Sequence, residues 1–207
     1  MLEHVPQWIG EMLKNVRAGH SKLVVAQDDI YTSGVRIDIS SPAFASGARL
    51  PERFTADGEG VSPPLVWGQA PEGTSSLALI VEDPDAPATS PLVHAIVWNI
   101  PPNEARLVEG AIAPDGEGDL DGSDVGRNSF LGEGWLPPDP PTGHGSHDYV
   151  FQLFALSQTP EVGPNPGRSE FVKAIRGNVL AAGILVGTYS RGEDAVIGFT
   201  ATSPATI

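Results

Sequence analysis

The chain has 207 residues, and its 26 acidic residues against 12 lysines and arginines give a net charge of −14. A chain of this length is within the usual size of one domain and buries a core without covalent staples. Cysteine is absent, which excludes disulfides, thiolate nucleophiles and zinc–thiolate sites. So acidic a chain lacks the basic footprint of phosphate-backbone recognition, and we expect neither nucleic acid nor an anionic membrane face as a partner.

The first 18 residues predict a short amphipathic helix, from about Gln7 to Ala18. Its apolar residues recur at helical spacing: Leu2, Val5, Ile9, Met12, Leu13 and Val16. We therefore assign residues 1–30 to a helical extension, and the apolar stripe makes a homodimer our expectation. Residues 1–22 hold no continuous apolar core of the secretory kind, and no later window approaches a membrane span. A cytoplasmic location is therefore expected.

From Val35 onward the pattern is that of β-strands. Strict alternation predicts a half-buried strand at Arg36–Ser40. Runs rich in β-branched and aromatic residues predict strands at Leu65–Trp67, Leu77–Val81, Leu92–Ile100 and Tyr149–Leu156. Loops rich in proline and glycine separate these runs, and helical patterns lie mainly near the two ends of the chain. The sequence therefore predicts one antiparallel, mainly β domain over residues 31–207 rather than a βαβ wind.

The C-terminal third carries a second helical pattern. Ser169 suits an N-cap, with Glu170 in the first turn, so a helix is expected from there through about Ala182. Thr188–Tyr189 and Ala195–Thr200 each suit a further strand.

The segment 111–128 is rich in aspartate and glycine and invites comparison with a calcium loop. Counted from Asp115, position 6 is Leu120 and position 12 is Gly126, so the required glycine and glutamate are both missing. We expect a solvated acidic loop.

Two proline-restrained loops carry the candidate site. Asp83 and Asp85 lie between two predicted strands, and His94 begins the second of them; His144 and His147 follow a loop with four prolines in residues 137–141. A Gly-x-Ser-x-Gly elbow and a phosphate-binding Gly-Lys-Ser/Thr loop are both absent. Two histidines and a carboxylate suit zinc, but rigid loops argue against it, so no metal or cofactor is expected.

Several of these residues lie in motifs that are similar to those of a known protein family. Asp83-Pro84-Asp85-Ala86-Pro87 with His94 downstream, then Pro140-Pro141-Thr142-Gly143 and His147-Asp148-Tyr149-Val150-Phe151, resembles the phosphatidylethanolamine-binding protein family, in particular the bacterial and archaeal group similar to Raf kinase inhibitor protein. Supporting segments are Ser62–Trp67, Pro71–Leu79, Asn99–Pro101 and Gly187–Tyr189. The similarity runs from about Ile37 to Arg191. It implies a β-sandwich in which a large central sheet packs on a smaller one, with a small anion pocket at one edge.

The resemblance also implies which residues form that pocket. The expected ligand-binding residues are Asp83, Asp85, His94, Asp139, Pro140, His147 and Tyr149, with Pro84, Pro87 and His144 as a second tier. Two positions depart from the family pattern. Asp139 stands where relatives carry glycine or cysteine, and Asp148 replaces an arginine. An added carboxylate and a lost cation should both weaken phosphate binding.

Three functions follow as expectations. The first is a non-catalytic binding module for a phospholipid headgroup, phosphomonoester or phosphopeptide, in which affinity rises as the pH falls toward about 6. The second is a regulator that acts on a kinase or protease by protein–protein contact. The third is a hydrolase or lyase that uses His94 or His147 with Asp83 or Asp85.

Overall fold

A computed structural model of the chain describes residue 13, residues 15–114 and residues 124–191. Within these ranges the strands are β1 (Ile39–Ser40), β2 (Leu65–Trp67), β3 (Ser76–Asp83), β4 (Leu92–Ile100), β5 (Arg106–Leu107), β6 (Asp124–Val125), β7 (His147–Leu156) and β8 (Val179–Tyr189). The helical elements are α2 (Arg168–Ile175) and the 3-10 turns η2 (His20–Lys22), η3 (Val24–Ala26) and η4 (Glu52–Phe54). No helix in the described ranges combines the length and apolar character needed to cross a bilayer.

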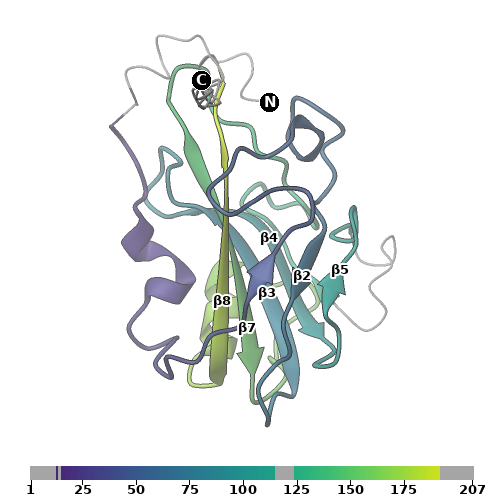
Figure 1. Ribbon diagram of the computed structural model, residues 1–207. Coiled ribbons are helices and arrows are strands. Elements are labelled where there is room, and N and C mark those ends of the chain that lie inside the picture. The colour runs from purple at the N-terminus through teal and green to yellow at the C-terminus, as the bar shows by residue number, and fades with distance from the viewer. Residues whose placement is uncertain (1–12, 14, 115–123, 192–207) are drawn as a thin grey trace, which may run out of the picture.

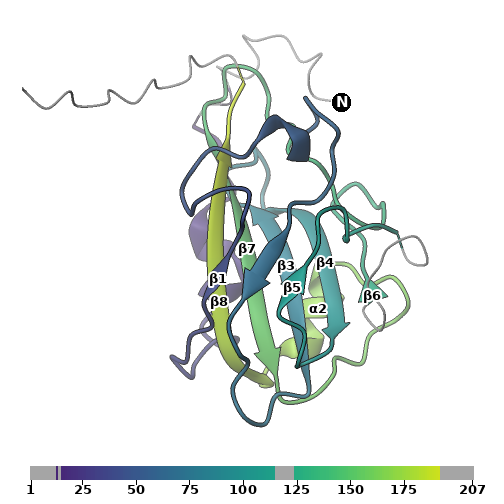
Figure 2. The same ribbon diagram turned by 45° about the vertical axis from the view of Figure 1, so that its right-hand side comes forward.

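The strands form two antiparallel sheets. The larger has the order β6-β4-β3-β7-β8, and the smaller has the order β1-β2-β5. In the larger sheet β3 lies between β4 and β7, with Leu79 opposite Val97 of β4 and Leu153 of β7. Figure 2 shows the smaller sheet in front of the larger one and α2 behind it.

Both faces of the larger sheet are covered, which explains why its central strands are mainly apolar. One face packs against the smaller sheet through a core that includes Leu79, Phe151, Leu65 and Trp67. The other face packs against α2 and the N-terminal turns through Ile80, Phe154, Phe171 and Val24, among others. All eight residues of β3 are buried as a result. A strand buried on both faces has a continuous apolar run, because successive side chains enter opposite cores.

The mainly β prediction with two packed antiparallel sheets is confirmed. The strands expected at Leu65–Trp67 and Leu92–Ile100 have those bounds, and the one expected at Tyr149–Leu156 begins earlier, at His147. The strand expected at Arg36–Ser40 is reduced to β1, with a single bridge from Arg36 to Ala182.

The helix expected from Ser169 through about Ala182 is wrong in its second half. It ends at Ile175, and the residues from Val179 onward form β8, which pairs with β7 along its length. Gly177 has a φ of 76° and turns the chain between the two elements. The open edge of β7 offers an interstrand ladder and a buried face, and this tertiary gain overrides a local helical preference.

The N-terminal helix expected at Gln7–Ala18 falls largely outside the described residues, and residues 16–18 within them are not helical. Val24 and Ile30 are buried in the core beneath the larger sheet, so this part of the extension packs with the domain. The strand expected at Ala195–Thr200 and the acidic residues 115–123 also lie outside the described residues.

Candidate functional site

Antiparallel pairing gathers the candidate residues at one end of the larger sheet. Asp83 ends β3 opposite Leu92, near the start of β4, and Glu82 pairs with Val150, near the start of β7. Antiparallel neighbours place the end of one strand beside the start of the next. The loop after β3 and the loop before β7 therefore meet at that end.

A small cavity of ≈ 50 Å³ lies between these loops. It is lined by Asp83, Ala86, Pro87, Leu92, His94, Phe130, Leu136, Pro137, Asp139, Pro140, Pro141, His147 and Tyr149. Pockets for drug-sized ligands measure about 300–1,000 Å³, whereas a water needs only about 10–15 Å³. The cavity therefore has room for one small chemical group rather than for a whole ligand.

Asp83 organises the loop that follows it. Its Oδ1 accepts hydrogen bonds from the backbone N–H groups of Asp85 at 2.7 Å and Ala86 at 3.0 Å, and its Oδ2 faces His147 Nδ1 at 2.8 Å. Aspartate often holds a turn in this way by bonding the backbone two and three residues on. Asp83 therefore shapes the loop and orients the histidine, and both of its oxygens are engaged.

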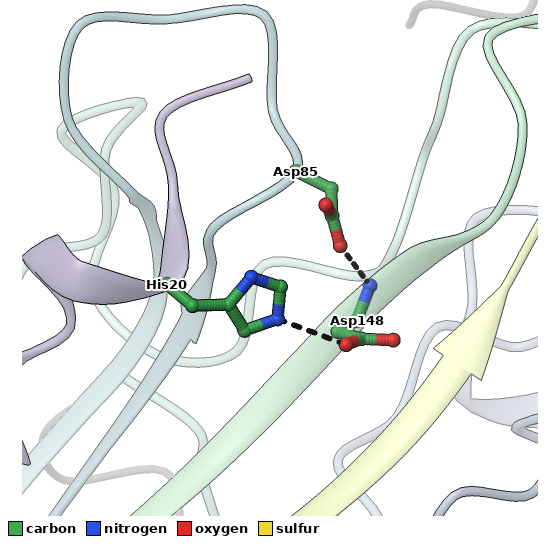
Figure 3. A group of neighbouring side chains, drawn as sticks. All are labelled: His20, Asp85 and Asp148. Carbon is green, nitrogen blue, oxygen red and sulfur yellow. Dashed lines mark hydrogen bonds and ion pairs between the residues drawn. The ribbon is translucent and has the colours of Figure 1, made fainter.

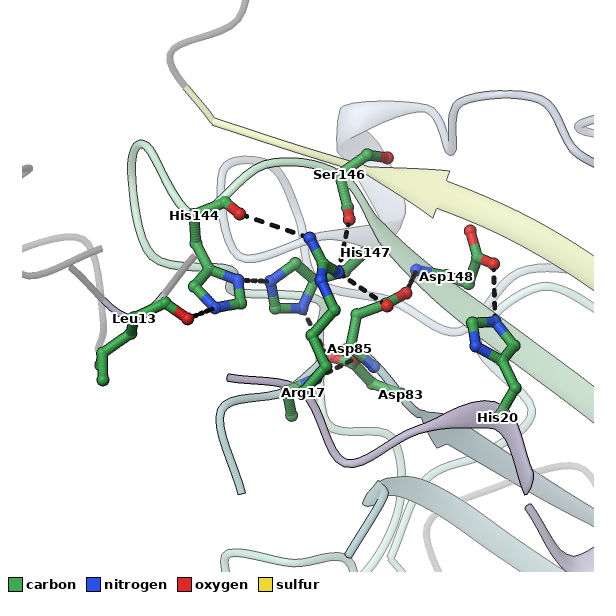
Figure 4. A network of polar contacts seen from close by, with 10 residues as sticks. Leu13, Arg17, His20, Asp83, Asp85, His144, Ser146, His147 and Asp148 are labelled. Atoms are coloured by element: carbon green, nitrogen blue, oxygen red, sulfur yellow. Dashed lines mark hydrogen bonds and ion pairs between the residues drawn. The ribbon is translucent and has the colours of Figure 1, made fainter. Parts of the chain in front are cut away.

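His144 lies behind His147 and outside the cavity lining. Its Nδ1 is 2.6 Å from His147 Nε2, and its Nε2 is 2.9 Å from the carbonyl oxygen of Leu13 (Figure 4). Gly143 and Gly145 flank it with φ angles of 82° and 99°, which lets the tight loop turn this side chain inward. A chain of three hydrogen bonds thus runs from Asp83 through both rings to Leu13.

The number of protons in this series of three hydrogen bonds follows from the groups at its two ends. The carbonyl of Leu13 and the ionised carboxylate of Asp83 only accept, so His144 Nε2 and His147 Nδ1 each donate. The contact between the rings needs a third proton, and three protons on two imidazoles make one cation. Burial, together with neighbouring His147, lowers the pKa of His144. The positive charge therefore lies on His147, paired with Asp83.

His94 differs from His147 in that its ring is neutral. Its Nδ1 is 2.6 Å from the carbonyl oxygen of Leu136 and must donate to it. Burial lowers the pKa of His94, against the opposing influence of Asp83 and of that carbonyl, so the ring is neutral. Its Nε2 then carries a lone pair, and this buried atom has no hydrogen-bond partner in the described part of the chain. Burying a polar atom without a hydrogen-bond partner costs free energy, so this atom favours a ligand that donates a hydrogen bond to it.

Tyr149 supplies a hydroxyl to the same cavity. Its ring meets His94 edge-on, with 5.0 Å between the centroids. Burial, and then the negative charge of Asp83, raises the pKa of Tyr149 well above its usual value, so the hydroxyl keeps its proton. Tyr149 therefore offers the cavity a hydrogen-bond donor beside the acceptor of His94.

Asp139 does not stand as an unpaired carboxylate at the rim. Arg191 forms an ion pair with it and binds Asp57 through Nε at 2.8 Å and Nη2 at 2.6 Å. The hydroxyl of Tyr189 also donates to Asp57, at 2.7 Å. The hydrogen bonds from Arg191 lower the pKa of Asp57. The charge that Asp139 was expected to add is thus offset by a guanidinium.

A segment before the domain braces both loops from behind; we name residues 15–22 the strap. Arg17 contacts Asp85 Oδ1 at 2.6 Å and donates to the carbonyls of Ser146 and His144, as Figure 4 shows. Asp85 Oδ2 accepts the backbone N–H of Asp148 at 2.8 Å. Asp85 therefore links the strap to the two loops and is absent from the cavity lining.

His20, Asp85 and Asp148 gather three potential metal-ligand atoms within 4.8 Å of one another (Figure 3). His20 Nε2 lies 3.0 Å from Asp148 Oδ2, and both oxygens of Asp85 already have partners. The contacts of the strap account for this cluster without an ion.

The sequence-predicted residues divide into two groups. Asp83, His94, Asp139, Pro140, His147, Tyr149 and Pro87 line the cavity, whereas Asp85, Pro84 and His144 are absent from its lining. Sequence reasoning missed Phe130, Leu136, Arg17 and Arg191. Arg191 lies two residues after the Gly187–Tyr189 segment and was marked only as the end of the resemblance; no local pattern singles out Arg17.

Comparisons with known proteins agree with this geometry. The family model for phosphatidylethanolamine-binding protein matches residues 40–190. A UPF0098 protein of Methanothermobacter thermautotrophicus is 38% identical over 156 residues, which cover 75% of this chain and 100% of that protein. A UPF0098 protein of Mycobacterium tuberculosis is 38% identical over 157 residues, 76% of this chain and 72% of that one.

Two solved structures are similar along most of their length. The phosphatidylethanolamine-binding protein homologue CT736 of Chlamydia trachomatis has a TM-score of 0.68 and 31% identity, with 75% of this chain and 98% of that chain covered. YbcL of E. coli, described as a member of the mammalian family, has a TM-score of 0.71 and 30% identity over 75% and 99% of the chains. The chain belongs to the phosphatidylethanolamine-binding protein family.

Proposed function

We propose that the protein is a non-catalytic binding module whose cavity holds the phosphate group of a small cytoplasmic ligand. The observation that carries this proposal is the buried Nε2 of His94, which lines a cavity of ≈ 50 Å³ and has no partner among the described residues. Tyr149 adds a hydroxyl donor to the same cavity. A tetrahedral group with oxygens that accept and donate hydrogen bonds suits this pair.

The charge around the cavity supports an anionic group. His147 carries both ring protons and stands in the wall as a cation next to Asp83. Asp85 is paired with Arg17, and Asp139 is paired with Arg191, which also binds Asp57. An anion in the cavity therefore meets carboxylates that are paired with cations, despite the acidic composition of the chain.

Calorimetry with phosphoethanolamine tests the proposal. We expect saturable binding at one site per chain, stronger at pH 5.5 than at pH 8. Tyr149→Phe should weaken it by about 10–100-fold, because a hydrogen bond to a charged group contributes about 1.5–3 kcal/mol. The hydroxyl has no hydrogen bond within the described chain, so this variant should fold normally. Absence of saturable binding at millimolar ligand would refute a phosphate pocket.

Hydrolysis is the second candidate, because an unprotonated imidazole nitrogen in a cavity is also the chemistry of a general base. His94 Nε2 is that nitrogen, while both nitrogens of His147 are engaged. Release of phosphate or alcohol from a panel of phosphoesters, lost in His94→Gln, would promote this candidate. Binding without turnover would favour the module.

A further inference from the structure

We propose that the bound phosphate brings a proton of its own, so that the pocket selects phosphomonoesters over phosphodiesters. This inference rests on the proposed phosphate-binding function and narrows it to one class of phosphate ester. It follows from which hydrogen-bonding atoms around the cavity are still free, and from whether each of them donates or accepts.

The free atom of His94 is an acceptor. Because Nδ1 gives its proton to the carbonyl of Leu136, a neutral ring leaves only a lone pair at Nε2. A fully ionised phosphate oxygen is also an acceptor, so it cannot form a hydrogen bond with this nitrogen. A P–OH group, in contrast, donates to the lone pair.

The other polar atoms of the lining do not change this balance. Asp83 uses Oδ1 for two backbone N–H groups and Oδ2 for His147. His147 uses its second nitrogen for His144, and Asp139 is paired with Arg191. Among the described residues, no lysine or arginine lines the cavity. The remaining donor is the hydroxyl of Tyr149, which suits a P–O⁻ oxygen next to the P–OH group.

The contact between His94 Nε2 and a phosphate oxygen could also gain its proton if the His94 ring were protonated. The surroundings of the ring disfavour this. Burial and the cation on His147 both oppose a charge on this ring, and only Asp83 and the carbonyl of Leu136 favour it. The uncharged neighbours Trp135 and Tyr149 pack against it without supplying a countercharge. The ligand is therefore the better source of the proton.

Monoesters and diesters differ in this one respect. The second ionisation of a phosphomonoester has a pKa of about 6, so about half of a monoester carries a P–OH at pH 6 and about a tenth at pH 7. A diester has no second proton to give. It can bind only by forcing a proton onto His94, or by leaving two acceptors in contact. Both routes cost affinity, and the monoester avoids them.

Titration of the full chain with methyl phosphate and dimethyl phosphate between pH 5 and pH 8 tests the inference. A ligand pKa of about 6 makes the protonated fraction about 90% at pH 5 and about 1% at pH 8. Affinity for methyl phosphate should therefore fall by about 90-fold across this range. Dimethyl phosphate should bind at least about tenfold more weakly at pH 5.5.

Two variants identify the atom responsible. His94→Gln replaces a bare acceptor by an amide, which both donates and accepts. We expect this variant to bind both esters within about threefold of each other and with little change between pH 6 and pH 8. Tyr149→Phe is the matched control, because it removes a donor that both esters use and should weaken both while keeping their ratio. Near-ultraviolet circular dichroism checks that each variant is folded.

The outcomes separate this inference from the function it rests on. If neither ester binds, the phosphate pocket itself is refuted. If both bind with similar affinity and no pH dependence, the pocket stands and the selection of monoesters is overturned. If only the monoester binds well, phosphoserine and a short phosphoserine peptide show whether the source is a small molecule or a peptide. The wild-type comparison decides the inference even if a variant fails to fold.

Discussion

Each carboxylate that lies near the pocket is paired with a cation, although Asp139 shares Arg191 with Asp57. Asp83 faces the doubly protonated His147, Asp85 faces Arg17, and Asp139 faces Arg191. The net charge of −14 therefore says little about the field inside the cavity. At short range in a region that excludes water, paired charges outweigh the distant, screened ones. The weakening of phosphate binding by Asp139 stays a prediction, and its ion pair with Arg191 makes the expected effect smaller.

Removal of Arg191 should destabilise the protein by about 3 kcal/mol, because it leaves Asp57 and Asp139 without their cation. The Arg191 side chain is 9% exposed and Asp139 is 11% exposed, whereas Asp57 is 32% exposed and keeps some hydration. Urea unfolding of Arg191→Gln measures this loss. Arg176→Gln is the control, since its ion pair with Asp29 is half exposed and should contribute less than about 1 kcal/mol. Equal effects would contradict the structural role of Arg191.

The buried, neutral His94 should make folding sensitive to acid. Its pKa is lowered in the folded state, so below about pH 6.5 the unfolded chain binds a proton that the folded protein does not. The free energy of unfolding should therefore fall as the pH drops from 6.5 until folded His94 is protonated, by at most about 1.4 kcal/mol per pH unit. His144, whose pKa is also lowered, acts in the same direction. Urea midpoints at pH 7.5 and 5.5 without phosphate measure this, and His94→Gln should show a smaller change than the wild type.

At the scale of elements, the strap joins the loop after β3 to the loop before β7. Besides the contacts of Arg17, the N–H groups of Ala18 and Gly19 donate to the carbonyls of Ala86 and Pro84, at 3.1 and 2.7 Å. The family match begins at residue 40, so the strap precedes it. This chain thus braces the back of its pocket with residues that lie outside the family match.

Loss of Arg17 should loosen the loops more than it destabilises the fold. Its side chain is 32% exposed, so the global effect of Arg17→Gln should stay within about 1 kcal/mol. Amide exchange at Ala18, Gly19 and Asp148 should nevertheless quicken, since Asp85 loses the partner that orients it. Hydrogen–deuterium exchange measures this. His20→Gln is the control, because it removes only the exposed contact with Asp148. Unchanged exchange in Arg17→Gln would show that the strap is held by its backbone alone.

Glu82 fastens α2 and the N-terminal turns to the larger sheet. It is fully buried and accepts hydrogen bonds from Arg168 at 2.6 Å, Gln152 at 2.8 Å and the backbone N–H of Val24 at 2.9 Å. A buried carboxylate is tolerated only when its partners are complete. One residue of β3 therefore ties α2 and the N-terminal turns to the sheet and also bonds the neighbouring strand β7.

Glu82→Gln should cost about 3 kcal/mol, because the amide cannot replace all three accepted bonds and leaves the Arg168 charge without its partner. Chemical denaturation measures the loss. Glu109→Gln, which removes an exposed ion pair with Arg53, should change stability by less than about 1 kcal/mol. The two variants alter charge equally, so a similar result from both would point to net charge rather than to the buried network.

At the scale of the whole molecule, both faces of the larger sheet are buried. This burial made most of the strands predictable from the sequence. A strand covered on both sides is apolar except where a buried polar side chain has its partners, and the run Leu77–Val81 has that pattern. The segment that became β8 was misassigned because alanine, leucine and valine suit a helix as well as a strand. Its assignment depends on β7, which is distant along the chain.

The sequence by itself determined β3, β4 and β7 of the larger sheet, the family and the residue types around the pocket. Proline-restrained loops and the residues Asp83, His94, His147 and Tyr149 were visible as local patterns. Only the tertiary structure decided the protonation of each histidine, because that depends on the carbonyls of Leu136 and Leu13. It also decided that Arg191 and Arg17 neutralise the carboxylates. These partners come from distant segments, and neither a carbonyl's direction nor a long-range ion pair leaves a local signal in sequence.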